Sequence, residues 1–489
     1  MKSSLSGSAP GAYSVNAAAS RYVPFSTRDG LLLTLLAAGQ AMIAADFALS
    51  SVALPSIERE LAVGPEMGQW AITAMTLGFG GFTLVGGRLA DIYGQKHCLI
   101  AGLACYTAGA FGCGFATVMS ALIACRALQG LGAAIMFPAT LSLIFCTFAE
   151  GPRRFRALTI SMAAQFVASP VAVVAAGKLI GELGWRGAFL VNAPVGLACL
   201  CLALFVVAPP PVRAPGTQTI DLPGAILSTA GFALLVWTIP TLMQKGTTAP
   251  VSALAGFGGS LVLLGGFVIL QRYLEAPLIS AEILRSKNFL AAVMVASLLI
   301  AAIAALYSLA LISLQQGLHF SPLKAGIALL PYGIVSLGTS LMAPRLAPRI
   351  LGNARLSMIT ALMGVAGCHL LISMAPASPE SLGYLMAAIV IAPIGGILGM
   401  NLAMNEALRC VRPEQQGTAS ALLYATSQLI VAISIASMAS AVDQGRVIGS
   451  TASLVAFAGS FRIGAVLCAL GIGFSLLVTR APQHVAGAR

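Results

Sequence analysis

Few ionisable side chains interrupt the apolar stretches of this 489-residue chain, and those few could do chemistry. Asp46 is a carboxyl group within one apolar stretch, and Arg126 is a guanidinium within another. An apolar environment disfavours the charged form of a carboxyl group, so such a group can bind and release a proton. Asp46 is therefore a candidate proton carrier or a site for a cationic substrate. The alternative is a structural hydrogen bond or an ion pair with Arg126.

Other polar residues in apolar stretches are weaker candidates. His369 is either a proton carrier facing a pore or a hydrogen-bonded packing residue. Asn401 and Asn405 lie one helical turn apart, so they either line a substrate cavity or bond a neighbouring helix. Glu406 is either a second buried acid or, because it precedes Arg409 by three residues, part of an ion pair at a helix surface, which is the favoured interpretation.

The sequence carries no signature of nucleotide, metal or nucleophile chemistry. It has no GxxxxGK(S/T) segment to hold ATP phosphates, and no Ser/His/Asp or Cys/His arrangement stands out. Most of the ten cysteines lie inside apolar runs and no CxxC pair occurs, which favours packing over disulfides or metal binding. We therefore expect no cofactor, no metal and no enzymatic activity.

The composition indicates the environment in which these residues lie. The chain is 58% hydrophobic and 9% charged, with a mean hydropathy of +0.93, whereas soluble domains carry roughly 25% charged residues. Its net charge of +12 comes from Lys and Arg in short gaps between apolar runs. That placement is typical of the positive-inside rule and not of nucleic-acid binding. The chain is expected to be an integral membrane protein.

Apolar stretches alternate with short polar breaks along the chain. Roughly 20 apolar residues form a helix that crosses the ~30 Å hydrocarbon core. Fourteen such spans are predicted, at residues 30–54, 69–88, 97–117, 119–146, 158–180, 187–208, 221–243, 251–271, 288–314, 322–343, 355–375, 383–405, 417–440 and 460–479.

Charge asymmetry predicts the orientation of these spans. Most of the 27 Lys and Arg residues fall on the inner side if the N-terminus is cytoplasmic, and an even number of spans returns the C-terminus to that side. Residues 1–28 are rich in Ser, Ala, Gly and Pro and lack the order of a signal peptide. They are predicted to be a disordered cytoplasmic tail, and residues 481–489 a second tail.

An internal repeat divides the chain. The tripeptide RLA at 88–90, after the second span, recurs at 345–347 after the tenth. We predict two six-helix halves, residues 29–208 and 288–480, separated by a linker and two-helix hairpin at 209–287. Duplicated halves that handle substrate between them are typical of secondary transporters.

Residues 87–96, GRLADIYGQK, resemble the signature loop of the major facilitator superfamily, GxLADRxGRK, with Ile92 and Gln95 replacing two basic residues. The resemblance implies that Asp91 docks on the positive end of a helix in the other half, which begins at 417–420. The alternative is an ordinary positive-inside loop. The implied gate residues are Gly87, Arg88, Asp91, Gly94 and Lys96.

Two further segments resemble motifs of this superfamily. Residues 126–132, RALQGLG, are similar to its RxxQGxG motif, which implies a part for Arg126 in proton movement and places Gln129 near a substrate cavity. The alternative role for Arg126 is a structural clamp. Residues 46–55, DFALSSVALP, resemble the DxTxxNVALP motif of the fourteen-span drug:proton antiporter branch, with Ala48 and Ser51 replacing Thr and Asn.

The resemblance to this branch covers nearly the whole chain, with one departure. Residues 185–196, WRGAFLVNAPVG, and 321–331, SPLKAGIALLP, are similar to two more of its segments. The GPxxGG motif of span five, a mark of export in the family, reads AVVAAG at 172–177, with Pro170 displaced upstream. This erosion counts against proton-driven export.

The resemblance implies an all-α major facilitator fold of fourteen transmembrane helices with the extra hairpin. It also implies a secondary active transporter in the inner membrane, which exports an amphipathic organic compound or drug in exchange for protons by alternating access. Its partners would be that substrate, protons and the lipid bilayer, with no nucleic acid and, by family analogy alone, a membrane-fusion partner. The rival expectations are an importer or uniporter without proton antiport, and a non-transporting membrane sensor or scaffold.

Overall fold

A computed structural model describes residues 25–148, 152–208, 221–245, 249–274, 278–279, 281–318, 320–375, 381–412, 415–447 and 458–478. The predicted tails lie outside these ranges except for residues 25–28, and so do residues 209–220 at the start of the predicted linker and hairpin. Within the described ranges the regular structure is entirely helical, as expected for a chain that must satisfy its backbone groups in lipid.

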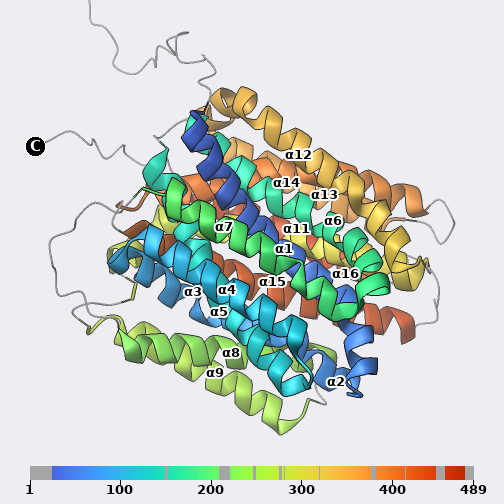
Figure 1. The fold of residues 1–489 in the computed structure, drawn as a ribbon. Helices are drawn as coiled ribbons and strands as arrows, with labels where there is room; N and C mark the ends of the chain where they lie inside the picture. Colours follow the sequence, from blue (N-terminus) through green and yellow to red (C-terminus); the bar gives the residue numbers. More distant parts are fainter. Residues whose placement is uncertain are drawn as a thin grey trace, which may run out of the picture.

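Seven helices form the N-terminal group (Figure 1). They are α1 (Thr27–Glu60), α2 (Pro65–Gly68), α3 (Trp70–Tyr93), α4 (Gln95–Phe115), α5 (Met119–Thr147), α6 (Pro152–Leu190) and α7 (Asn192–Val206).

The remaining helices form a hairpin and a C-terminal group. The hairpin consists of α8 (Leu222–Lys245) and α9 (Val251–Leu270), which lie side by side at the lower edge of Figure 1. The short α10 (Ala281–Arg285) leads into the C-terminal group, whose members are α11 (Lys287–Ile312) with the π-helical turn η3 (Ser313–Gly317), α12 (Pro322–Gly352), α13 (Ala354–Ser373), α14 (Ser381–Arg409), α15 (Gln416–Val447) and α16 (Ala458–Leu477).

The two groups meet along two seams. In one seam α6 packs against α12 and α14, and in the other α3 and α5 pack against α15. The hairpin helix α8 packs on both α3 and α15, so it covers the second seam from one side. Each of the two seams, where the groups could separate, therefore contains helices of both groups.

Twelve described helical stretches are long and apolar enough to cross a membrane. One of them, Arg153–Val206, is 54 residues long and includes α6 and α7, with Gly184 at a φ of 70° inside it. Within α8 the apolar stretch Pro223–Ile239 is shorter than the twelve candidates. The chain is thus a multi-pass helical membrane protein, and the predicted count of fourteen is not established by these helices.

Local sequence explains where several helices begin and end. Ser26 caps α1 through a reciprocal pair of hydrogen bonds with Asp29. Gly94 separates α3 from α4 with a φ of 86°, a conformation that favours glycine. The prediction that residues 87–96 form a loop was wrong except at Gly94: residues 88–93 contain no Gly or Pro, so α3 continues to Tyr93, and α4 begins at Gln95.

Candidate functional site

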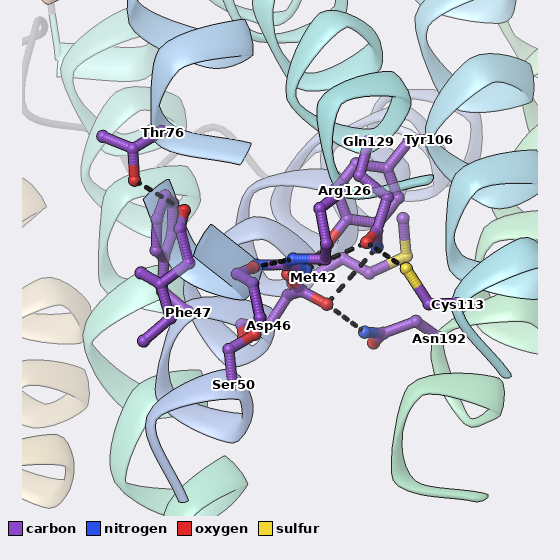
Figure 2. Close-up of polar contacts among 12 residues, drawn as sticks. Met42, Asp46, Phe47, Ser50, Thr76, Tyr106, Cys113, Arg126, Gln129 and Asn192 are labelled. Atoms are coloured by element: carbon purple, nitrogen blue, oxygen red, sulfur yellow. Dashed lines mark hydrogen bonds and ion pairs between the residues drawn. The ribbon is translucent and has the colours of Figure 1, made fainter. Parts of the chain in front are cut away.

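The two predicted membrane charges, Asp46 and Arg126, form an ion pair in the interior of the N-terminal group (Figure 2). Both side chains are completely buried. Arg126 Nη1 donates to Asp46 Oδ2, and Arg126 Nε donates to the Ala71 carbonyl oxygen at 2.6 Å. The pair joins α1 to α5, and the second contact adds α3. Buried charges need such partners because desolvation of an unpaired ion costs several kcal/mol.

Two amides complete the coordination of this carboxylate. Asn192 Nδ2, at the start of α7, donates to Asp46 Oδ1 at 2.9 Å. Gln129 Nε2 lies 3.4 Å from the same oxygen, while its Oε1 accepts from Arg126 Nη1 at 2.9 Å. We call Asp46, Arg126, Gln129 and Asn192 the charge cluster. Its members come from three helices, α1, α5 and α7, so relative movement of these helices would change the environment of the carboxyl group.

Glycines bring the helices close enough for this cluster to form. A Cβ atom at Gly130 of α5 would lie 3.0 Å from the Gly78 Cα of α3. A Cβ at Gly109 of α4 would lie 2.7 Å from Gln129 Cγ. Small residues at such positions allow backbones to approach in a membrane, where packing rather than hydrophobicity drives helix association.

Sequence reasoning placed three members of the cluster and missed the fourth. Asp46, Arg126 and Gln129 were candidates, whereas Asn192 was recognised only as part of the WRGAFLVNAPVG segment. An amide side chain inside the predicted span 187–208, within a family-like segment, was the available signal. Cys113 of α4 also reaches the cluster, with its Sγ 3.3 Å from Gln129 Oε1.

The predicted gate residue Asp91 lies at the α3–α15 seam and is 2% exposed. Its Oδ1 accepts from the Gly417 backbone N–H at 2.9 Å. Its Oδ2 accepts from the Thr418 backbone N–H at 2.8 Å and from the Thr418 hydroxyl at 2.7 Å. These are the first N–H groups of α15, where the helix dipole favours a negative charge.

The other gate candidates surround this contact. A Cβ at Gly87 would lie 2.5 Å from the Gly417 carbonyl oxygen, so only glycine fits there without movement of the helices. Arg88 is half-buried one turn before Asp91. Lys96 Nζ donates to the Leu204 and Val207 carbonyl oxygens at 3.1 and 2.7 Å, and so binds the C-terminal end of α7.

Aromatic rings extend the α3–α15 seam towards the middle of the bundle. The Tyr424 ring of α15 packs against Phe137 of α5 and Phe79 of α3, with centroid distances of 3.7 and 4.9 Å. Phe79 and Asp91 are twelve residues apart on α3, about 18 Å along a helix. The seam is therefore closed over more than half of the ~30 Å hydrocarbon thickness.

The remaining candidates lie elsewhere, in the C-terminal group. His369 is fully buried, with Nε2 3.1 Å from the Ala302 carbonyl oxygen and its ring against Gly464, so it packs between α11, α13 and α16. Asn401 is also buried, and its Nδ2 donates to Ile397 of its own helix at 2.8 Å. Asn405 is 5% exposed on the same helix, α14. Glu406 accepts from Arg409 at 3.0 Å, as its spacing predicts, but the prediction of a surface position was wrong because the Glu406 side chain is only 11% exposed.

A second charged contact was not anticipated from the sequence. Glu60, at the end of α1, accepts from the Trp185 indole at 2.7 Å and forms an ion pair with Arg186. Arg186 also donates to the Ala116 carbonyl oxygen at 3.0 Å, so α1, α4 and α6 are joined at this end of the bundle.

We expect Glu60→Gln to lower the free energy of unfolding by roughly 1 kcal/mol or less, because both partners are substantially exposed. The glutamine keeps an acceptor for the Trp185 indole. Thermal unfolding of the purified protein measures the change. A loss of about 3–5 kcal/mol, the scale of breaking a buried pair, would contradict this assignment as a surface contact.

Comparison with known proteins agrees with this architecture. The profile of the Major Facilitator Superfamily matches residues 36–437. The cephamycin export protein CmcT of Amycolatopsis lactamdurans is 33% identical over 443 residues, covering 90% of each chain. The puromycin resistance protein pur8 of Streptomyces alboniger is 31% identical over 409 residues, covering 83% of this chain and 80% of that one.

A solved structure shares the fold at low sequence identity. The human organic anion transporter MFSD10 has a TM-score of 0.64 and 15% identity, covering 92% of this chain and all of that one. The family match spans most of the chain, which confirms the resemblance seen in the motifs and excludes an enzymatic role. The protein is a membrane transporter and belongs to the Major Facilitator Superfamily.

Proposed function

We propose that this transporter exports amphipathic organic compounds, antibiotics among them, in exchange for protons by alternating access. The observation that carries the proposal is the charge cluster. In this cluster the carboxyl group of Asp46 and the guanidinium of Arg126 are completely buried inside a helix bundle that spans a membrane. Such residues are costly in a membrane and mark ion or proton pathways.

The coupling we propose depends on whether Asp46 is paired with Arg126. In the structure the two side chains are completely buried and in direct contact. Movement of α1 relative to α5 would weaken the ion pair and favour proton uptake, and its return would favour release. Arg126 keeps its charge throughout, because a guanidinium does not deprotonate in proteins.

The names of the similar proteins support an organic compound as the substrate. One of them is named for cephamycin export and another for puromycin resistance, and each aligns with four fifths or more of this chain. Both names denote organic antibiotics. Puromycin and a cephamycin are therefore the first compounds to test in cells that lack their own exporters. Cells producing this chain should accumulate less of at least one compound, and Asp46→Asn should restore accumulation.

A uniporter or importer remains the second candidate, because α6 continues without a helix break through residues 172–177. The open space around Gly177 also differs from the tight packing expected of the GPxxGG motif. Uptake assays separate the two. An importer would raise accumulation of a compound, and a uniporter would work equally without a pH gradient.

We also propose the predicted topology of fourteen crossings, with two six-helix halves and both termini in the cytoplasm. Two considerations support it. Arg153–Val206 is more than twice the ~20 residues of one crossing and contains a kink at Gly184, so it fits two spans. The full α8 has 24 residues, enough for a crossing.

Reporter fusions test this topology. A fusion after Gln244, at the end of α8, should report the outer side, and a fusion after Gln483 should report the cytoplasm. The positive-inside asymmetry of the chain is the physical reason. Fusions that both report the same side would contradict fourteen crossings.

A further inference from the structure

Two glycines of α12 bring this helix against α6 in the first of the two seams. A Cβ atom at Gly326 would lie 2.8 Å from Val173 Cγ1 of α6. A Cβ atom at Gly333 would lie 3.2 Å from Pro170 Cγ and 3.5 Å from Val167 Cα. A branched side chain at either position would therefore have to move the two helices apart.

The two glycines act along one face of α12. Gly326 and Gly333 are seven residues apart, which is close to two helical turns, so both lie on the same side of the helix. Their separation along the helix axis is about 10 Å. The close contact between α6 and α12 therefore extends over roughly a third of the ~30 Å hydrocarbon core.

The segment of α6 that replaces the GPxxGG motif does not supply this contact through a glycine of its own. Residues 172–177 contain one glycine, Gly177, and no atom of the described residues lies within 4 Å of a Cβ atom placed there. Pro170, which is displaced upstream of the motif position, instead meets Gly333 of α12. The glycines that permit close approach thus belong to α12 and not to α6.

Aromatic rings continue the same seam. Tyr332, beside Gly333, is 1% exposed, and its ring centroid lies 6.0 Å from that of Phe166 on α6 and 5.4 Å from that of Tyr307 on α11. Tyr332 is ten residues from Pro322, the first residue of α12, or about 15 Å along the helix. The seam is therefore closed from the start of α12 to about the middle of the ~30 Å hydrocarbon core.

The two seams are held near opposite surfaces of the membrane in the proposed topology. Asp91 binds the start of α15, which is the cytoplasmic end of that helix. Gly326 lies near the start of α12, which is the outer end. A transporter that rocks between two open states needs its two groups to meet on whichever side is closed. The α6–α12 contact is placed to close the outer side.

We infer that Gly326 and Gly333 are positioning residues of the transport cycle, which let α12 approach α6 closely enough to seal the outer end of their seam. The inference rests on the proposed alternating access, because a seal matters only if the two groups separate. It does not depend on the identity of the substrate or on proton coupling. It also weakens the argument against export drawn from residues 172–177, because the close contact forms without the motif.

The test measures the opening of each seam through a buried serine replaced by cysteine, in a background without the native cysteines. Ser336 lies almost one turn after Gly333 on α12 and is fully buried, and Ser420 is the corresponding probe at the α3–α15 seam. Gly333→Val should raise the modification rate of Ser336→Cys by about 5- to 150-fold, because overpacking destabilises the closed seam. Gly326→Val should act in the same direction.

Two further variants make the test specific. Gly338→Val is the matched control on the same helix, because no atom of the described residues lies within 4 Å of a Cβ atom at Gly338. It should leave the modification rate unchanged. Gly326→Ala should raise the rate, and adding Val173→Ala should restore it, because alanine lacks the Cγ1 atom that the new Cβ would meet. The Ser420→Cys rate should stay constant throughout.

Three outcomes would overturn the inference. Equal rates in Gly333→Val and Gly338→Val would show that the close contact does not control the seam. Faster modification of both cysteine probes would indicate a general loss of packing. A Gly326→Ala effect that Val173→Ala does not reverse would have another cause.

Thermal unfolding shows which variants are folded, and the Gly326→Ala series remains a test if Gly333→Val is not. Export of puromycin and a cephamycin by the wild type is scored separately. A wild type that exports neither compound would count against the proposed function, whereas the modification rates alone decide the role of the two glycines.

Discussion

Asp46→Asn is expected to abolish substrate transport driven by a pH gradient while substrate binding remains measurable. The asparagine keeps the size of the side chain and accepts hydrogen bonds, but it cannot bind and release a proton. In the wild type, Asp46 Oδ1 accepts from Asn192 and Oδ2 pairs with Arg126, so the carboxyl group is held where helix movement changes its partners. Loss of gradient-driven flux by a factor of about 100 or more corresponds to roughly 2.7 kcal/mol or more of lost coupling.

The measurement is flux into proteoliposomes with an imposed pH gradient, alongside exchange without a gradient. Asp46→Glu should keep part of the gradient-driven flux, because it restores a carboxyl group. His369→Gln serves as the matched control, since His369 is an equally buried titratable residue that packs in the C-terminal group. Gradient-driven flux at the wild-type rate in Asp46→Asn would show that Asp46 does not carry the proton.

A folding control is needed because Asp46→Asn leaves Arg126 without its counter-charge. Breaking a buried pair by neutralising one partner costs about 3–5 kcal/mol. The double variant Asp46→Asn with Arg126→Gln removes both charges and should recover much of that stability. It should still fail to couple transport to protons. Recovery of coupling in the double variant would assign the loss in Asp46→Asn to misfolding.

Asp91→Asn is expected to favour opening of the α3–α15 seam and to slow transport without preventing insertion. The Asp91 carboxylate accepts three hydrogen bonds from the first residues of α15, and its charge interacts with the dipole of that helix. The charge–dipole interaction is worth about 0.3–2 kcal/mol. Its loss should raise the open fraction of this seam by up to about 30-fold.

Cysteine accessibility measures this opening. Ser420 is fully buried at the seam, so Ser420→Cys in a background without the native cysteines should be modified faster when Asp91→Asn is added. Asp221→Asn is the matched control. Asp221 is also a buried carboxylate that accepts from the start of a helix, Gly224 N–H at 2.7 Å, but it binds within the hairpin and not across the seam. An unchanged modification rate in Asp91→Asn, with full transport, would make Asp91 an ordinary helix-end residue.

The sequence was sufficient to predict the helical membrane fold, because long apolar runs allow few other structures in lipid. It also identified Asp46 and Arg126, since a charge within an apolar run stands out without knowledge of its neighbours. Their pairing was one of the alternatives considered, and the structure places them in direct contact. The contact of Asp91 with Gly417 and Thr418 could be expected only through the family resemblance.

Other features depend on tertiary contacts that one sequence does not display. Asn192 became part of the charge cluster because α7 begins beside α1, and a single sequence does not show which helix an asparagine side chain meets. His369 was ambiguous because hydropathy does not reveal which face of a helix meets a neighbour.

The most direct test of proton-coupled export is a simultaneous record of substrate and proton movement by the purified wild-type transporter in proteoliposomes. We predict that an imposed substrate gradient drives protons in the opposite direction, and that Asp46→Asn abolishes the proton movement. Substrate movement without any proton movement, in wild-type protein shown to be folded, would contradict the account.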